Sequence, residues 1–249
     1  MKEERQQSIL KILREKEFAS AQYLSKKLYV SLPTIRRDLN ILQKRGLIER
    51  SSGGAMLLQD SRMDIPIVFR SSSRMDLKSR LCRLAAPLVK EGDVVFIDAS
   101  TTTLHLVDHI KSIKNITVVT NSVPVCNLLY RNHIKAYCAG GFLVESSYAF
   151  VGTRAEEFIS DFNANIVFFS SCALDNTGLV TDYSERETSL RKTMLRHAQK
   201  RVFLCDENKL GKSSAFNVCS VQDLDVLVTN FRLPEKMQAE GVTHLLLEE

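Results

Sequence analysis

Four side chains that can hydrogen-bond to DNA recur at short intervals in one stretch of the chain. They are Arg36, Arg37, Asn40 and Lys44. Arg pairs with guanine O6 and N7, Asn pairs with adenine, and Lys meets backbone phosphate. At about 100° per residue, the last three share one side of a helix, opposite its apolar residues. The spacing predicts a helix with a core face and a DNA-reading face; a solvated charged face is the alternative.

A second group of polar residues has the chemistry to hold a phosphorylated small molecule. The candidates follow four short apolar runs and are Asp98, Ser100, Thr101, Thr102, Asn121, Ser122, Gly140, Gly141, Asp206 and Lys209. Hydroxyls and backbone N–H groups at the start of a helix bind anions, and a lysine adds a positive charge. An ordinary helix cap would explain the first loop if it stood alone. Four such groups together favour a sugar or polyol phosphate.

Two further kinds of chemistry receive less support from the residues. The six cysteines contain no Cys-x-x-Cys pair, and Cys172 has no visible base partner, so we expect reduced, structural thiols. His105 and His109 have the i, i+4 spacing of a zinc pair, but Leu106 replaces the glutamate of the usual motif and no third ligand is evident. We therefore expect neither a metal nor a cofactor.

The enzymatic alternative is a sugar-phosphate isomerase that carries an accessory DNA-binding domain. Isomerisation needs a carboxylate base and a group that polarises the carbonyl. Carboxylates occur near the middle of the chain, at Asp175, Asp182, Glu185 and Glu187, but they form no recognisable motif. We expect a regulator rather than an enzyme.

The reading helix is predicted to span Ser31 to Gly46. Ser31 can cap its start, Pro33 suits the first turn, and Gly46 provides a stop. A shorter helix capped by Ser20 precedes it and runs to Leu28. The three residues between the two helices make the tight turn of a helix-turn-helix.

Flanking segments complete a winged helix. An apolar stripe predicts a first helix over 4–16, and two short strands, 47–50 and 55–58, surround a Gly-containing turn at 51–54. Arg50 and the backbone of this wing can touch phosphate or the minor groove. The predicted DNA contacts are Ser31, Thr34, Arg36, Arg37, Asn40, Lys44 and Arg50.

Charge and composition divide the 249 residues unequally. Residues 1 to 60 contain 12 Lys or Arg against 7 Asp or Glu, whereas the remainder contains 22 of each. A basic segment joined to a neutral one is typical of a DNA-binding module attached to another domain. An oligomeric scaffold that binds neither DNA nor ligand is the alternative, but it would not explain why the basic excess coincides with the helix-turn-helix motif. We predict a DNA-binding domain over 1–58, a polar linker over 59–74 and a second domain over 75–249. Because the N-terminus lacks a signal-peptide core and no run could span a membrane, we expect a cytoplasmic protein.

The pattern of the second domain predicts an α/β fold. A helical pattern over 75–90 precedes a strand at 94–98, and apolar runs then alternate with helical patterns at 117–120, 134–138, 165–169, 201–205 and 226–229. Strands that are apolar on both faces and separated by helices form a parallel sheet covered on both sides. Ligands bind such sheets at the carboxyl ends of the strands, where the polar candidates fall.

Motifs in both halves resemble the DeoR family of bacterial transcription regulators. Thr34-Ile-Arg-Arg-Asp-Leu39, Gly46-Leu-Ile and Arg50-Ser-Ser-Gly-Gly-Ala55 are similar to its N-terminal signature, with Ser52 where His is frequent. The second half of the chain contains, in the same order, motifs similar to those of the family's sensor domain: Gly92-Asp93, Asp98-Ala-Ser-Thr-Thr, Thr120-Asn-Ser, Gly140-Gly, Gly152 and 206–211. The resemblance extends to about residue 230. It implies a sensor similar in fold to ribose-5-phosphate isomerase.

Two segments differ from the family pattern. Ser170-Ser-Cys-Ala173 replaces a Gly-x-Ser-Gly turn, and Phe142-Leu143 follows the glycine pair where an Arg is frequent. The isomerase relatives also have a lysine followed by a glycine run, which this chain lacks. The resemblance implies a phosphorylated sugar or polyol effector held by the Ser/Thr loop and Lys209. We therefore expect a repressor of a carbohydrate-utilisation operon that this effector releases from operator DNA. Because one winged helix covers only a few base pairs, we also expect a homo-oligomer, either a dimer or a tetramer.

Overall fold

The computed structural model describes residues 2–16, 18–45, 47–51, 53–57, 70–71 and 73–248. The chain divides into two compact units, Met1–Met75 and Asp76–Glu249, and each is described by itself. Most of the predicted linker, 59–74, lies outside the described residues, as does the predicted helix stop at Gly46.

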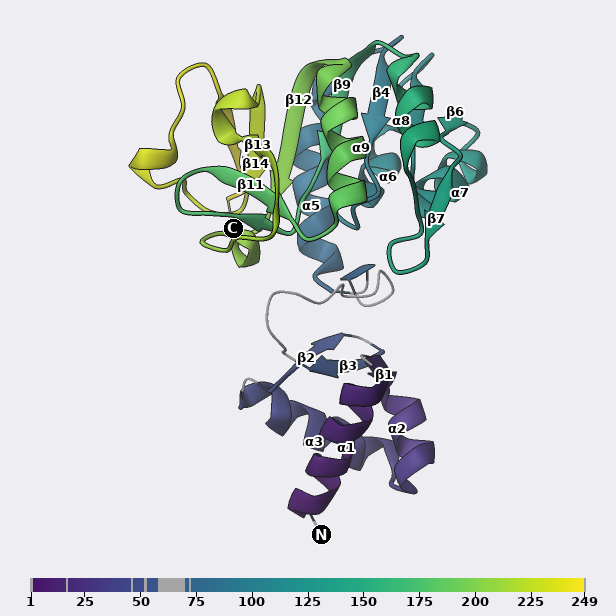
Figure 1. Ribbon diagram of the computed structural model, residues 1–249, viewed down its shortest axis with the longest axis vertical. Helices are drawn as coiled ribbons and strands as arrows, with labels where there is room; N and C mark the ends of the chain where they lie inside the picture. Colours follow the sequence, from purple (N-terminus) through teal and green to yellow (C-terminus); the bar gives the residue numbers. More distant parts are fainter. Residues whose placement is uncertain are drawn as a thin grey trace. The chain divides into compact units, whose positions relative to one another are not determined.

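Over residues 2–57, the described part of the N-terminal unit consists of three helices and a small antiparallel sheet (Figure 1). The helices are α1 (Lys2–Lys16), α2 (Ala21–Leu28) and α3 (Leu32–Lys44), and the strands are β1 (Phe18–Ser20), β2 (Ile48–Ser51) and β3 (Gly54–Leu57). The strand order is β1-β3-β2, so the two predicted wing strands are confirmed. Strand β1 was not predicted, because three residues are too few to show a period.

The predicted apolar faces of these helices form the core of the unit. Ile9 and Leu13 of α1 pack with Ile35, Leu39 and Leu42 of α3, and none of the five is more than 1% exposed. Removing this apolar stripe from water is what holds the three helices together.

The two predicted helix caps have different outcomes. Ser20 caps α2, since its hydroxyl accepts the backbone N–H of Tyr23 at 3.0 Å. The cap predicted at Ser31 is wrong: its hydroxyl accepts no backbone N–H, and its Oγ instead lies 2.9 Å from Oγ1 of Thr34. A hydroxyl bonded to a neighbouring side chain is diverted from the backbone of the first turn.

A seven-stranded, wholly parallel sheet forms the centre of the second unit. In spatial order its strands are β15 (Thr243–Leu246), β14 (Val226–Thr229), β12 (Ala198–Cys205), β9 (Ala164–Phe169), β4 (Val94–Ile97), β5 (Thr117–Thr120) and β6 (Lys135–Cys138). Six of the seven overlap the predicted apolar runs, so the parallel α/β fold is confirmed; β15 was not predicted.

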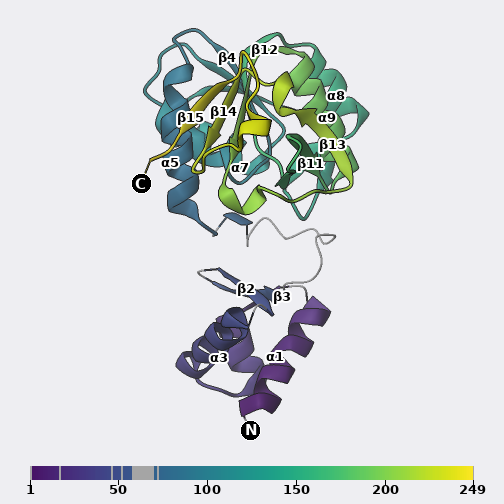
Figure 2. The same cartoon turned by 90° about the vertical axis from the view of Figure 1, so that its left-hand side faces the viewer.

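Helices cover both faces of this sheet, which explains why its strands are apolar on both sides. On one face lie α5 (Met75–Ala85), α6 (Leu106–Ile110) and α7 (Val123–Arg131); on the other lie α8 (Thr153–Ser160) and α9 (Glu185–Arg196). Figure 2 shows α5 on one side of the sheet and α8 with α9 on the other. Alternate residues of β9 face the two cores: Phe168 packs with the α5 layer and Phe169 with the α9 layer.

Small antiparallel elements complete the unit and were not predicted. A hairpin pairs β7 (Phe142–Val144) with β8 (Ala149–Val151), and a three-stranded sheet joins β10 (Ala173–Leu174), β11 (Leu179–Asp182) and β13 (Phe216–Ser220). Single 3-10 turns follow several elements: η1 (Ala86–Leu88), η2 (Thr103–His105), η3 (Glu207–Lys209), η4 (Val221–Asp223) and η5 (Glu235–Met237). In the part of the chain that the structure describes, every helix is too short or too polar to cross a bilayer.

Candidate functional sites

The outer face of α3 carries the predicted DNA-reading side chains. Arg36, Arg37, Asn40 and Lys44 are all exposed. Asp38, the one carboxylate of the helix, is 1% exposed and faces the core, where Arg5 Nε lies 2.5 Å from its Oδ2 and Gln6 donates to its Oδ1 at 3.2 Å. Because α1 neutralises this carboxylate internally, the exposed face of α3 presents hydrogen-bond donors and positive charge, and no free carboxylate, to a polyanion.

The predicted contact residue on the wing is tied to the reading helix. Nη1 of Arg50, on β2, donates a hydrogen bond to Oδ1 of Asn40. Paired recognition of adenine needs that oxygen as an acceptor for the base amino group. An amide oxygen has two lone pairs, so the bond from Arg50 leaves one of them available for the amino group of an adenine.

In the second unit, polar residues meet where the sheet reverses its strand order. From β4 the chain continues outward to β5, and from β9 it continues in the opposite direction to β12. Asp98 follows β4 and Ser170 follows β9, and the backbone N–H of Ser170 donates to Oδ2 of Asp98 at 3.3 Å. Such a reversal point is where open α/β sheets bind ligands.

Asp98 is buried and fully hydrogen-bonded. Its Oδ1 accepts the backbone N–H of Ser100 at 3.1 Å and the hydroxyl of Thr103 at 2.8 Å, and its Oδ2 accepts from Ser170 and from Nε of Arg191. Four donors occupy both oxygens. A sugar hydroxyl can bond to this carboxylate only by displacing one of them, so Asp98 mainly positions its neighbours.

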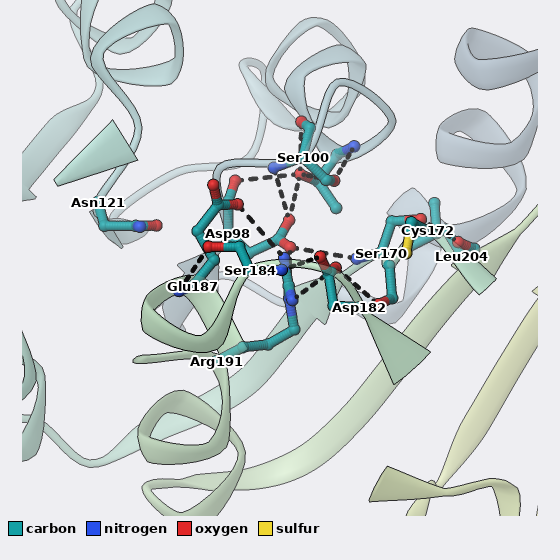
Figure 3. Close-up of polar contacts among 12 residues, drawn as sticks. Asp98, Ser100, Asn121, Ser170, Cys172, Asp182, Ser184, Glu187, Arg191 and Leu204 are labelled. Carbon is teal, nitrogen blue, oxygen red and sulfur yellow. Dashed lines mark hydrogen bonds and ion pairs between the residues drawn. The ribbon is translucent and has the colours of Figure 1, made fainter. Parts of the chain in front are cut away.

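Arg191 of α9 was not predicted as a site residue, although it organises this region (Figure 3). Only 5% exposed, its guanidinium lies 3.1 Å from Asp98, 3.1 Å from Asp182 and 4.0 Å from Glu187. Burial by itself lowers the pKa of Arg191, but the three carboxylates outweigh it and raise the pKa above its usual value. In the sequence, Glu187 and Arg191 look like an ordinary i, i+4 surface pair.

A small cavity lies beside this cluster. It is lined by Asp98, Ala99, Asn121, Glu187, Leu190, Arg191 and Met194. Its volume is about 10 Å³, roughly the space of one water molecule, so a sugar phosphate enters only if side chains of α9 move. Asn121, 3% exposed, points its side chain toward Asp98 and Glu187, and its Oδ1 has no hydrogen-bond partner.

The hydroxyl loop after β4 also differs from the prediction. It leads into the single turn η2 and the five-residue helix α6, so the helix dipole expected to favour an anion is small. The loop has instead a buried cation that was not predicted: Nζ of Lys78, on α5, donates to Oγ1 of Thr101 at 3.1 Å, and Lys78 is 7% exposed. Thr102 is also buried.

Most of the remaining sensor candidates make structural contacts, and none of them lines the cavity. Lys209 donates to the hydroxyl of Ser170 at 2.6 Å and lies 3.6 Å from Asp206, while Ser122 caps α7. Gly141 has φ +134°, and a Cβ there would lie 2.8 Å from a backbone oxygen of β8, so the hairpin requires glycine. Nothing lies within 4 Å of a Cβ built at Gly140.

Two other chemistries considered from the sequence, a cysteine nucleophile and a histidine zinc site, have no supporting geometry in the described residues. Burial and the Asp182 carboxylate raise the pKa of the Cys172 thiol, which disfavours its nucleophilic thiolate, and all six cysteines are free. Nε2 of His109 lies 3.0 Å from the hydroxyl of Ser79 rather than facing a metal position. Within the described ranges, no three His, Cys, Asp or Glu residues are grouped to hold a metal ion.

Comparisons with known proteins cover both units. Residues 5–61 match the family model described as a DeoR-like helix-turn-helix domain, and residues 73–230 match the DeoR C terminal sensor domain. The transcriptional repressor AccR of Agrobacterium fabrum is 28% identical over 96% of both chains. The regulator GlpR of Haloferax volcanii is 32% identical over 96% of both. A ribose 5-phosphate isomerase A from Methanocaldococcus jannaschii is 17% identical over 55% of each chain, with a TM-score of 0.42.

Proposed function

Because the chain belongs to the DeoR family of transcriptional regulators, we propose that it is a sequence-specific repressor of a carbohydrate-utilisation operon. The observation that carries this proposal is the outer face of α3, which exposes Arg36, Arg37 and Lys44 while Asp38 is neutralised inside the core. A face with donors and no free carboxylate suits operator DNA. The family is one of regulators, so the isomerase alternative is not retained.

The proposed effector is a phosphorylated sugar or polyol bound at the strand-order reversal. The phosphate lies against the Ser100–Thr102 loop, where Lys78 supplies a buried positive charge next to Thr101. Lys209 is a second cation for it once released from Ser170. Charge-assisted hydrogen bonds of this kind are the strong ones in phosphate sites.

The hydroxyl end of the effector occupies the cavity beside Arg191. Three carboxylates surround this single arginine, so the region carries an excess of negative charge and disfavours a phosphate. The unpaired Oδ1 of Asn121 accepts a hydrogen bond, which suits a sugar hydroxyl. The two ends of the effector are therefore recognised by different groups, with Asp98 hydrogen-bonded to both regions.

The repressor acts in the cytoplasm as a homo-oligomer. One winged helix spans only a few base pairs, so specific binding requires two modules on repeated half-sites. A symmetric oligomer places them there, and the effector releases DNA by preferring the arrangement with low operator affinity.

A binding assay with the full chain tests the proposal. A duplex selected by the chain from random DNA is titrated by fluorescence anisotropy, with and without phosphorylated and unphosphorylated polyols. We expect release by a phosphorylated compound only. In a parallel thermal-shift assay, the same compound at about 100 times its Kd should stabilise the chain by roughly 2.7 kcal/mol. If no duplex is enriched, the DNA-reading assignment is wrong; if a duplex is bound but only unphosphorylated sugars release it, the phosphate assignment is wrong.

A further inference from the structure

Exposed large apolar side chains are concentrated in one segment of the sensor unit. The described residues include nine of them, and six fall between residues 123 and 148: Val123, Tyr130, Tyr137, Phe142, Leu143 and Tyr148. Their exposed fractions range from 38% to 81%. Scattered apolar residues are normal on a surface, but a concentration of this kind marks an interaction site.

The elements that carry these residues adjoin one another. The backbone N–H of Val123, at the start of α7, donates to the carbonyl of Tyr148 at 3.0 Å, which joins α7 to the β7–β8 hairpin. Helix α7 leads directly into β6 and packs against it. Figure 1 shows α7, β6 and β7 together at one end of the sheet. We call this region, residues 123–151, the edge surface.

Strand β6 leaves one side of its backbone unpaired. It ends the seven-stranded sheet, its one partner among the described strands is β5, and all four of its residues are exposed. Ala139 donates its N–H inward to Thr120 at 2.8 Å, and because N–H directions alternate along a strand, those of Ala136 and Cys138 point outward. An open edge is a template for another strand.

We propose that the edge surface is the homodimer interface of this protein, with β6 pairing antiparallel to β6 of a second copy. An antiparallel pair of identical strands is self-complementary about a two-fold axis, so the contact closes at two chains. The six exposed side chains offer roughly 600 Å² of apolar area, most of the about 800 Å² per partner that a stable interface buries. Lys135, which could repel a partner, is drawn toward its own chain, 5.8 Å from the Tyr137 ring.

The same surface connects to the proposed effector cavity through Asn121. Asn121 lines the cavity and its Oδ1 has no hydrogen-bond partner, while its Nδ2 donates to the carbonyl of Phe150 on β8 at 3.0 Å. The backbone carbonyl of Asn121 accepts the backbone N–H of Phe150 at 2.8 Å. This link rests on the proposed function: an effector that draws Asn121 into the cavity shifts the hairpin, and with it the spacing of the two DNA-binding modules.

Sedimentation velocity of the full chain tests the interface. We expect the parent at twice the 28.2-kDa chain mass, and a dimer dissociation constant raised at least about 100-fold in the double variant Leu143→Asp with Tyr148→Asp. Met75→Asp, which adds a charge at an exposed apolar residue outside the edge surface, should leave the dimer unchanged. A monomeric parent, or a double variant that dimerises like the parent, overturns the proposal.

A matched pair of substitutions in β6 tests strand pairing separately from apolar burial. Ala136→Pro removes one outward N–H and should dissociate the dimer, whereas Ala136→Thr keeps that N–H and should not. Circular dichroism confirms that both variants are folded. A folded Ala136→Pro variant that remains dimeric overturns the pairing. The two proposals fail in different ways. If these variants dissociate the dimer but no phosphorylated polyol affects the parent, the interface proposal stands and only the effector proposal is wrong.

Discussion

Nε of Arg191 donates to Oδ2 of Asp98 at 3.1 Å, although the two residues lie 93 positions apart in the sequence. The bond joins α9, on one face of the parallel sheet, to the loop that follows β4. Through its Nη1, the same guanidinium reaches Asp182 at the end of β11. One buried arginine thus holds together the hydroxyl loop, the helix that lines the cavity and the small antiparallel sheet.

Removing Arg191 should strongly destabilise the sensor unit. In Arg191→Ala, three buried carboxylates lose their cation, and breaking a buried ion pair from one side costs about 3 to 5 kcal/mol. Calorimetric unfolding measures the loss. Arg154→Ala, at an exposed position on α8, is the control and should change stability by less than about 0.5 kcal/mol. Equal losses in the two variants would show that the cluster contributes no special stability.

Asp182 should make the unfolding free energy depend on acid pH. Burial raises the pKa of this carboxyl, but the charge of Arg191 and hydrogen bonds from Ser171, Ser184 and Tyr183 outweigh it, so the folded pKa lies below the ordinary 3.8. The stabilisation that the ionised Asp182 provides is complete above the ordinary pKa of 3.8 and is lost as pH falls through the lower, folded pKa. The stability gap between the parent and Asp182→Asn should therefore narrow below pH 3.8 in acid-titrated unfolding. A gap independent of pH would contradict this linkage.

Substitutions on the exposed face of α3 should cause two kinds of DNA-binding defect. Arg36→Ala or Arg37→Ala should weaken operator binding by roughly 1 to 3 kcal/mol and relax base preference, if the lost contact is to a base edge. If Lys44 contacts a phosphate, Lys44→Ala should weaken binding to all sequences alike and lower the salt slope by about one unit. Anisotropy titrations at several salt concentrations separate the two. Unchanged isotherms for all three variants would refute the assignment of α3.

Lys209 tests the effector site without disturbing the DNA-binding unit. If it binds phosphate, Lys209→Ala should bind operator normally but need far more effector for release, within the 5- to 150-fold range typical of allosteric coupling. Lys209→Arg retains the charge and serves as the control. If Lys209 only joins Ser170 to Asp206, the alanine variant will have a lower melting temperature and an unaltered release curve.

What the sequence by itself determined is local. The apolar period of Ile35, Leu39 and Leu42 placed the core face of the reading helix, and the apolar runs placed most of the parallel strands, because a helix or a buried strand must match its side-chain period to the core. Since parallel strands end at one edge of a sheet, the same pattern also located the polar loops after β4, β5, β6 and β12.

Only the tertiary structure decided which charged side chains are buried and which partners they are buried against. Lys78, 23 positions from Thr101, and Arg191, 93 positions from Asp98, carry no local mark of burial, and in the sequence both resemble solvated residues of a helix surface. The same holds for Asp38, whose partner Arg5 is 33 positions away. A buried charge is tolerated only where folding places an opposite charge or donors beside it, so these positions follow from the packing of distant segments rather than from any period in the chain.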